Sequence, residues 1–305
     1  MSKFTAWIQA SRLPSQAYIF FPILLGEMIA YCRTGTLNWP VFGVLHLFGL
    51  CIQLYIVYAN DYADHAIDQL NTTYTMFSGG SRVLVDGKLS RLEIGVAAAT
   101  MAACSLLAGG LLHIVFHRAF ALLFVLLALF VLYAYSFPPI RLSYRGGGEI
   151  LQMLGVAVLL PVFGYYAQTG HLDRFPLMIF WVLAPTNLAC AIATSLADEP
   201  SDRQGDKRTT SVLLGNRGAK ICILALNSFT IPLVAWNLLT EFGKGVQWTF
   251  LVSMVLPLLC AIIVYQRARP GTRQLEIFVA CTILITVGIT GWLAFYYASG
   301  PFCGV

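Results

Sequence analysis

The chain has 305 residues, of which 58% are hydrophobic and 11% are charged. This is more apolar surface than one water-soluble core of this length needs, so the sequence predicts an integral membrane protein whose solvent is the lipid bilayer. The formal net charge of +5 comes from basic residues that flank apolar segments. We interpret it as a signal of membrane topology and expect no binding to nucleic acid.

Apolar windows of about 20 residues, the length that crosses the hydrocarbon core as a helix, recur along the chain. They predict an all-α polytopic membrane protein with nine transmembrane helices. The windows cover residues 15–32, 40–60, 92–112, 118–136, 150–168, 175–196, 219–239, 246–266 and 276–298. No Pro- or Ser-rich linker separates them, which favours a single membrane domain over residues 1–305.

The distribution of basic residues predicts the orientation of these helices, because Lys and Arg are retained on the cytoplasmic side of a membrane. With the N-terminus inside, fifteen of the nineteen basic residues fall on the cytoplasmic side. The other side carries Arg33, Arg118, Arg174 and Lys244. This asymmetry supports the helix count and predicts a cytoplasmic N-terminus.

Polar residues interrupt the apolar pattern at the end of the second predicted helix, in the segment NDYADHAID. Asn60, Asp64 and Asp68 recur there every four residues, which places them on one helix face about 5–6 Å apart. Carboxylates near membrane depth are costly and commonly mark a site or an ion path. His65 points about 100° away from Asp64 on an ideal helix, so we leave it out of the site.

A second polar segment, DEPSDRQGD, follows the sixth predicted helix. Asp198, Asp202 and Asp206 repeat the four-residue spacing, and the distribution of basic residues places both segments on the cytoplasmic side. Two facing columns of oxygen ligands could be neutralised by Mg²⁺, a hard cation that binds one or two carboxylates together with substrate phosphates. The two columns therefore predict one site for a metal ion and a diphosphate.

Basic residues accompany both aspartate segments. Arg82 lies in FSGGSRVLVDGKLS, Arg141 and Arg145 lie in YSFPPIRLSYRGGGE, and Lys207 and Arg208 lie in GDKRTTS. Arg and Lys bind phosphate oxygens through charge-assisted hydrogen bonds, as a diphosphate site requires. A solvated rim of acidic residues at the membrane surface is the simplest alternative. It would leave the shared spacing, depth and flanking cations as coincidences.

The same segments resemble the UbiA superfamily of intramembrane aromatic prenyltransferases. The first is similar to that superfamily's N-x-x-x-D-x-x-x-D motif, and the second to its D-x-x-x-D motif followed by a basic residue, here Lys207. SRVLVDGKLS is similar to its R-P-L-x-x-G segment, and WIQASRLPSQAYIFFPILLG to its first helix. YSFPPIRLSYRGGGEI and SDRQGDKRTTSVLLG resemble the branch that prenylates 1,4-dihydroxy-2-naphthoate in menaquinone synthesis.

The resemblance implies helices around a central cavity and the Mg²⁺-dependent transfer of a polyprenyl group from polyprenyl diphosphate to a small aromatic acceptor. We expect the enzyme in the cytoplasmic membrane of a bacterium, with its active site facing the cytoplasm. The implied metal ligands are Asn60, Asp64, Asp68, Asp198 and Asp202. The implied catalytic residues are the four aspartates of that set with Arg82 and Lys207, and the implied substrate-binding residues are Asn60, Asp61, Tyr135, Arg141, Tyr144, Arg145 and Arg208.

Several positions depart from the naphthoate branch. That branch usually has Gly where Asp68 and Asp206 stand and Asp where Leu70 stands, and NDYADHAID is closer to the 4-hydroxybenzoate branch. The superfamily's tyrosine-and-lysine motif appears here with an arginine, Arg141 or Arg145. The acceptor therefore stays open between 1,4-dihydroxy-2-naphthoate, 4-hydroxybenzoate, a haem and a non-quinone aromatic. A cation-coupled transporter is the other alternative, although the flanking basic residues would repel its cargo.

Overall fold

The computed structural model describes residues 2–241 and 244–299, and the side chains of residues 2–233 and 254–299. Apart from one isolated β-bridge between Thr75 and Ser78, the regular secondary structure of these residues is helical. The prediction of an all-α fold is confirmed. The long helices are α2 (Ala17–Thr34), α3 (Trp39–Asp68), α4 (Arg91–Ile114), α5 (Ala121–Ser136), α7 (Leu160–Thr169), α8 (Phe180–Ser195), α10 (Thr210–Glu241), α11 (Lys244–Val264) and α12 (Arg273–Ser299).

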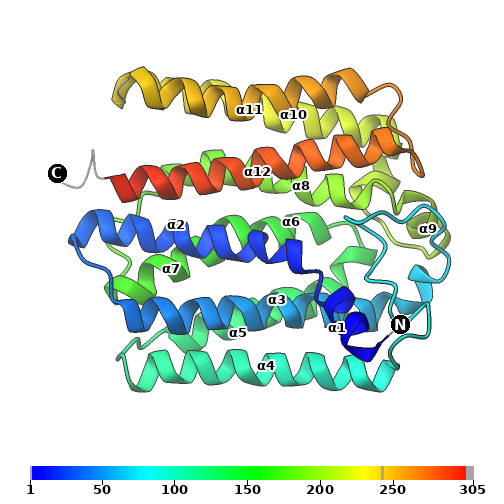
Figure 1. Ribbon diagram of the computed structural model, residues 1–305, viewed down its shortest axis with the longest axis horizontal. Helices are drawn as coiled ribbons and strands as arrows, with labels where there is room; N and C mark the ends of the chain where they lie inside the picture. The colour runs from blue at the N-terminus through cyan, green and yellow to red at the C-terminus, as the bar shows by residue number, and fades with distance from the viewer. Residues whose placement is uncertain (1, 242–243, 300–305) are drawn as a thin grey trace.

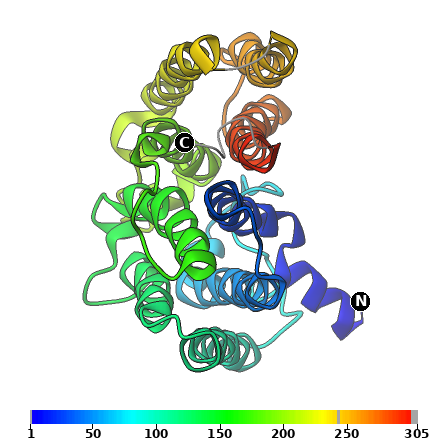
Figure 2. The ribbon, with the colours of Figure 1, turned by 90° about the vertical axis from the view of Figure 1, so that its left-hand side faces the viewer.

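The short elements complete the chain order. They are α1 (Lys3–Ser11), η1 (Leu13–Gln16), η2 (Leu142–Tyr144), α6 (Gly148–Met153), the π-helical η3 (Leu154–Leu159), η4 (Leu177–Ile179) and α9 (Glu199–Gln204). The long helices run side by side (Figure 1), and seen end-on they form an open ring (Figure 2). Neighbours in sequence pack together, as α3 does on α4, and α2 also packs on α7 and α12. The short helices α1 and α9 lie at the same end of the bundle (Figure 1).

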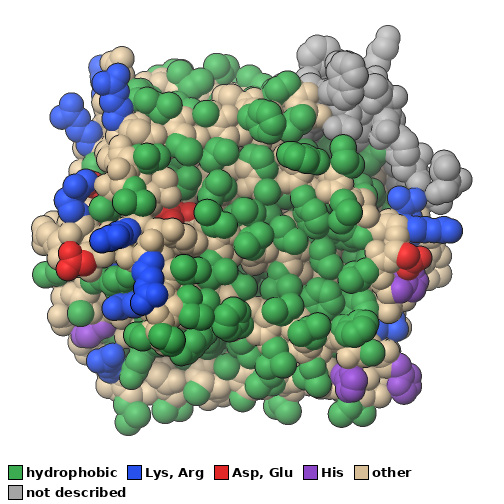
Figure 3. Space-filling model, turned by 180° about the vertical axis from the view of Figure 1, so that it is seen from behind, with side chains coloured by type: hydrophobic (Ala, Val, Ile, Leu, Met, Phe, Trp, Pro, Cys, Tyr) green, Lys and Arg blue, Asp and Glu red, His purple; other side chains and the backbone are tan. Residues whose placement is uncertain are grey.

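Six helical segments are long and apolar enough to cross a membrane, judged by length and composition over the described residues. They are Lys3–Thr34, Trp39–Asp68, Arg91–Ile114, Gly148–Thr169, Leu177–Ser195 and Arg273–Ser299, with Ala121–Ser136 and Met254–Val264 as shorter apolar helices. Hydrophobic side chains cover the middle of the molecule, and charged ones gather at its two ends (Figure 3). Each predicted window overlaps a helix, and the count of nine spans stays a prediction. The side chain of Lys244, expected on the outer side, lies outside the described residues.

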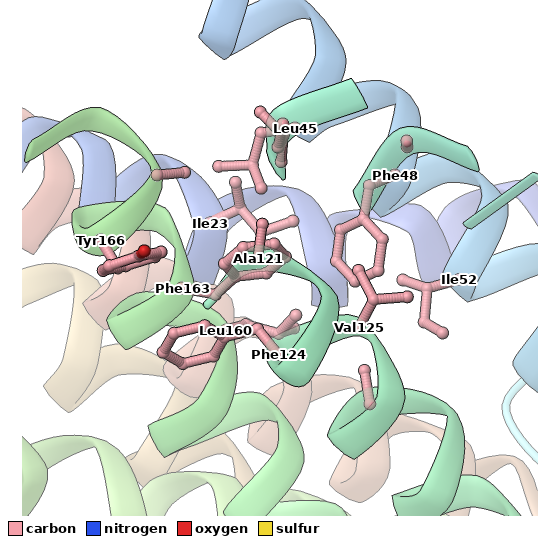
Figure 4. Packing of buried hydrophobic residues seen from close by; sticks show 14 of the residues in the cluster. Ile23, Leu45, Phe48, Ile52, Ala121, Phe124, Val125, Leu160, Phe163 and Tyr166 are labelled. Atoms are coloured by element: carbon pink, nitrogen blue, oxygen red, sulfur yellow. The ribbon is translucent and has the colours of Figure 1, made fainter. Parts of the chain in front are cut away.

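Interlocking apolar side chains hold α2, α3, α5 and α7 together (Figure 4). The ring of Phe163 stacks on that of Phe124 at 4.9 Å between centroids and meets the edge of Phe48 at 5.2 Å. Glycines bring α2 and α7 into backbone contact, because a Cβ at Gly26 would lie 2.0 Å from the carbonyl oxygen of Pro161. Such small residues let helices approach closely in membranes, where burial from water does not drive helix association.

A buried carboxylate lies within the same helices, far along α2 from α1. Glu27 is 0% exposed, accepts a hydrogen bond of 3.0 Å from the Gln168 amide and lies 2.8 Å from His46 Nε2. The Gln168 side chain also accepts a 3.0 Å hydrogen bond from the backbone of Asn38. This polar cluster ties α2, α3 and α7 together and satisfies a group that would be costly if left unpaired in a membrane interior.

Candidate active site

The two aspartate segments meet at the end of the bundle where α1 and α9 lie, which we call the aspartate end (Figure 1). The first segment is the last part of α3, and the second is the junction of α8 with the short helix α9. Asp198 precedes α9 and Asp202 lies within it, whereas Asp206 comes after its end in a left-handed conformation (φ 57°) and is exposed. The expectation that Asp206 continues a helical column is therefore wrong.

Asp64 is the point at which three chain segments converge. Its carboxylate is buried and accepts hydrogen bonds from Asn60 Nδ2 at 2.9 Å, Tyr144 Oη at 3.1 Å and Lys207 Nζ at 2.8 Å. Asn60 lies one turn earlier on α3, Tyr144 ends η2, and Lys207 follows α9. The spacing of Asn60 and Asp64 could be read from the sequence, but the contacts with the other two residues depend on the tertiary fold.

Lys207 links the two aspartate segments. Its ammonium lies 2.8 Å from Asp64 Oδ2, 3.6 Å from Asp202 Oδ1 and 5.3 Å from the centroid of the Tyr144 ring. Burial opposes the charge on Lys207, but the carboxylates of Asp64 and Asp202 outweigh it and raise the pKa of Lys207 above its usual value. The side chain is therefore a buried cation held between two carboxylates.

Asp198 fastens the loop after α3 to the second segment. It accepts hydrogen bonds from Asn71 Nδ2 at 2.7 Å and from the backbone N–H of Gly79 at 3.1 Å. Gly79 has a left-handed φ of 79°, and a Cβ there would lie 2.5 Å from Cβ of Tyr74, so this close approach requires glycine. Burial raises the pKa of Asp198, and it raises that of Asp202 to about 7, with Lys207 opposing the shift.

Arg82 lies against the C-terminal end of α3. Its Nη1 donates to the backbone carbonyls of Asp68 and Asn71, and its guanidinium lies 4.4 Å from the centroid of the Tyr74 ring. Its Nε is buried and has no hydrogen-bond partner within the described part of the chain. Arg82 thus caps carbonyls of a helix end and keeps one N–H donor for a further partner. Gly80 packs directly on Asp68, since a Cβ there would lie 2.3 Å from Asp68 Oδ2.

Asp61 is occupied by partners that the sequence did not indicate. It pairs with the guanidinium of Arg12 and accepts hydrogen bonds from the hydroxyl and, at 3.1 Å, the backbone N–H of Ser81. Gln9 of α1 donates a 2.7 Å hydrogen bond to the carbonyl of Ser81. Asp61 therefore joins α1 to the loop that carries Arg82, and the substrate-binding role expected for it stays a prediction.

The remaining expected substrate-binding residues lie around the aspartates that contact Lys207. The Arg141 guanidinium stacks 3.4 Å from the centroid of the Tyr144 ring, and Tyr135 packs on Gly148. Arg145 and Arg208 are exposed. They line a pocket of about 600 Å³ together with Tyr144, Arg203, Asp206 and Lys207.

The donor chemistry of the site fits a hard divalent cation. Carboxylates of both segments and the amide of Asn60 supply oxygens, and one carboxylate from each segment, Asp64 and Asp202, lies at 2.8 and 3.6 Å from the ammonium of Lys207. Lys207 brings one positive charge to the two carboxylates beside it, Asp64 and Asp202, so negative charge is in excess there. Over the described residues, no three His, Cys, Asp or Glu side chains form a ready-made ligand cluster. A bound Mg²⁺ would offset the excess charge.

Comparison with known proteins agrees with this geometry. The sequence profile of the UbiA prenyltransferase family matches residues 19–282. The chain belongs to the UbiA prenyltransferase family. The superfamily resemblance seen in the sequence is thereby confirmed, and this chain is a membrane-embedded prenyltransferase. The cation-transporter alternative is no longer needed.

Relatives of this UbiA prenyltransferase have low sequence identity to it but align over most of both chains. It is 23% identical to 1,4-dihydroxy-2-naphthoate octaprenyltransferase of Bacillus subtilis over 82% of this chain and 78% of that protein. It is 25% identical to 2-carboxy-1,4-naphthoquinone phytyltransferase of Synechocystis sp. over 82% of this chain and 79% of that protein. Both named relatives prenylate naphthalene-derived rings.

Solved structures show the same fold. A UbiA homologue from Archaeoglobus fulgidus bound to GPP and Mg²⁺ matches with a TM-score of 0.68 at 17% identity, over 96% of this chain and 99% of that chain. A UbiA homologue from Aeropyrum pernix matches with a TM-score of 0.63 at 20% identity, over 88% and 95% of the two chains. The UbiA fold is thus shared despite the low identity.

Proposed function

We propose that this UbiA prenyltransferase catalyses the Mg²⁺-dependent transfer of a polyprenyl group from polyprenyl diphosphate to 1,4-dihydroxy-2-naphthoate. One observation carries the reaction type: Asp64 and Asp202 come from segments far apart in the sequence, yet both lie beside the ammonium of Lys207, at 2.8 and 3.6 Å. Oxygen ligands and a cation gathered at one place suit a metal ion and a diphosphate together.

The proposed metal ligands are the oxygens of the two segments. Asp64, Asp68, Asp198 and Asp202 would hold Mg²⁺. The amide N–H of Asn60 donates to Asp64, which leaves the amide oxygen of Asn60 as a further ligand. When bound, Mg²⁺ supplies Lewis-acid neutralisation that makes diphosphate a better leaving group. The hydrogen bonds from Asn71 and Gly79 to Asp198 fix the position of the second segment relative to the first.

The basic residues are proposed to stabilise the charge that develops as the prenyl C1–O bond breaks. The diphosphate keeps the electron pair of that bond, and its oxygens would be held by Lys207 and by the Arg82 N–H that has no partner among the described residues. Burial raises the pKa of Tyr144, so its hydroxyl stays protonated and donates to Asp64. Arg141, stacked 3.4 Å from the centroid of its ring, would hold Tyr144 in place beside Asp64. An electron-rich ring carbon of the acceptor then bonds to C1. The ring regains aromaticity when that carbon releases carbon dioxide from its carboxylate or, at an unsubstituted position, a proton to water, and the electron pair of the broken bond returns to the ring.

The choice of acceptor rests on the named relatives and on the sequence segments around η2 and α9. Both relatives carry naphthalene-derived acceptors in their names, and YSFPPIRLSYRGGGEI and SDRQGDKRTTSVLLG resemble the naphthoate branch. The basic residues of the segments that carry the site, Arg82, Lys207 and Arg208 among them, support an active site that faces the cytoplasm. 4-Hydroxybenzoate, a haem and a non-quinone aromatic are the competing acceptors.

One experiment tests both parts of this proposal. Membranes containing the protein are incubated with Mg²⁺, a labelled polyprenyl diphosphate and each candidate acceptor, and the lipid product is identified by mass. Prenylated naphthoate product is the expected result. A product formed only with another acceptor would reject the naphthoate assignment, and the absence of prenylated product with every acceptor would contradict the reaction.

A further inference from the structure

The pocket beside η2 lies next to the aspartate cluster but is built differently from it. Its lining includes Tyr144 and Lys207, two of the three residues whose side chains donate to Asp64, so the pocket and the cluster share a wall. On its other sides it is lined by Arg145 and Arg208, both exposed. The pocket therefore joins the solvent at the aspartate end to the buried cation of the site.

The charges in this pocket are not balanced. Arg203 pairs with Glu199 at 2.6 Å, and Lys207 pairs with Asp64. Among the described residues, Arg145 and Arg208 form no ion pair, and neither does Asp206, which is the carboxylate in the lining, so the two guanidinium groups leave an excess of one positive charge. Two unpaired guanidinium groups at the mouth of a pocket of about 600 Å³ make it a site for an anion with several oxygens.

The reaction supplies such an anion on the inner side of this wall. A prenylated aromatic product leaves into lipid, but inorganic diphosphate carries several negative charges, and even one charge is costly in the hydrocarbon. The leaving group must therefore reach water at the aspartate end. The pocket that shares Lys207 with the aspartate cluster provides the solvent-facing opening beside that cation.

We propose that this pocket is the exit site for inorganic diphosphate, where Arg145 and Arg208 bind the anion after it leaves the aspartate cluster. The proposal rests on the prenyltransferase function proposed above. A hydrogen bond of 2.7 Å from the backbone N–H of Thr210 to Glu149 joins the chain segments that carry the two arginines. It links the segment of Arg145 to the segment of Arg208.

A carboxylate on the acceptor is a second source of the same anionic chemistry, since it too would enter from water.

The two sources are separated by binding and kinetic measurements on the full chain in detergent. The variants are Arg145→Gln/Arg208→Gln and the charge-retaining Arg145→Lys/Arg208→Lys. The matched control is Arg267→Gln, an exposed arginine between α11 and α12, remote in sequence from both pocket walls.

The first measurement is calorimetric titration with inorganic diphosphate in EDTA, which removes the metal and leaves the pocket as the principal anion site. We expect the Gln double variant to raise Kd about tenfold or more, as the loss of charge-assisted hydrogen bonds predicts. The Kd of the Lys double variant should lie between those of the Gln double variant and wild type, and the Kd of Arg267→Gln should match that of wild type. No diphosphate binding by wild type, or equal binding by wild type and the Gln variant, would overturn the exit site.

The second measurement is product inhibition of prenyl transfer by inorganic diphosphate. The inhibition constant should rise about tenfold or more in the Gln double variant, while KM for the acceptor changes little. A raised KM for a carboxylated acceptor with an unchanged inhibition constant would instead make the pocket an acceptor entrance and reject our proposal. If no transfer is detected at all, the proposed function fails, and the calorimetric result still decides whether the pocket binds diphosphate.

Discussion

Lys207 Nζ lies 2.8 Å from Asp64 Oδ2, although 143 residues separate them in the chain. The same ammonium is 3.6 Å from Asp202. A single buried cation therefore connects α3 with the segment around α9, and it lies where any diphosphate held by the two aspartate segments would need a positive charge. Position and charge together make Lys207 the residue whose replacement should affect the reaction most directly.

Replacing Lys207 with methionine keeps much of the side-chain volume but removes the charge. We expect kcat to fall about 10²–10³-fold, the usual effect of removing one electrostatic donor from an active site. Steady-state kinetics in detergent would measure it. Lys220→Met is a matched control, because Lys220 is also buried but donates to the carbonyls of Tyr265 and Ala268 instead of facing the aspartates. It should lower the melting temperature and leave the kcat of the folded enzyme near that of wild type.

The two aspartate segments should act as one unit. If both hold metal for the same diphosphate, Asp64→Asn and Asp202→Asn each abolish most turnover, and the double variant is little worse than either single variant, because groups that work together are not additive. Rates of prenyl transfer for the three variants test this. If the fold-loss in rate of the double variant equals the product of the two single losses, the segments contribute independently and do not form one site.

Arg82 should contribute to diphosphate binding in a metal-bound site. Titration with a non-hydrolysable prenyl thiodiphosphate should show much weaker binding after EDTA removes the metal. Arg82→Ala should raise Kd about 10- to 150-fold, which corresponds to about 1.5–3 kcal/mol for a hydrogen bond to a charged group. Because Arg82 also caps the end of α3, the melting temperature of the variant must be measured in parallel. A Kd that changes neither when EDTA removes the metal nor in Arg82→Ala would contradict the proposed site.

Much of the fold and part of the site follow from local sequence pattern. The apolar windows coincide with helices because the length of each window is set by the membrane itself. Asn60 and Asp64 meet as predicted, since residues four apart share a face of a helix. The same rule fails at Asp206, because α9 ends at Gln204 and the chain leaves the helix before reaching it.

Contacts between segments far apart in the sequence could not be read from spacing. Nothing in the local sequence pairs Arg12 with Asp61, or Glu149 with the N–H of Thr210 at the start of α10. These are side chains whose partners are chosen by tertiary packing, and both satisfy groups that would otherwise be unpaired. The substrate-binding role that the resemblance implies for Asp61 stays a prediction, and its contacts join it to Arg12 at the end of α1 and to the Arg82 loop.

The pairing of Arg12 with Asp61 leads to a prediction about coupling. Arg12→Ala and Asp61→Ala should each lower the melting temperature and the rate of prenyl transfer, because α1 would lose its attachment to the Ser81 loop. A double-mutant cycle should give a coupling free energy of about 0.5–3 kcal/mol, as for residues in direct contact. Thermal unfolding in detergent measures it. If Asp61 instead bound substrate independently of Arg12, Asp61→Ala would raise KM whether or not Arg12 was present, and the coupling free energy of the two residues in unfolding would be near zero.

The contact between α2 and α7 gives a prediction about stability in which two glycines should respond with opposite sign. A Cβ at Gly26 would meet the backbone of Pro161 and, at 2.7 Å, the backbone nitrogen of Tyr165, so neither neighbour can rotate away. Gly26→Ala must push the helices apart, and we expect a loss of about 1–3 kcal/mol, as for overpacked cores. Gly43 of α3 has no atom within 4 Å of such a Cβ.

Gly43→Ala should therefore stabilise the protein by about 0.4–1 kcal/mol, because alanine reduces the conformational freedom of the unfolded chain without strain in the helix. Melting temperatures of the two variants in the same detergent measure the contrast. A lower melting temperature for Gly26→Ala and a raised one for Gly43→Ala are expected. Equal responses would show that the backbone contact between α2 and α7 does not limit stability, and that close packing of these two helices is not what holds this half of the bundle together.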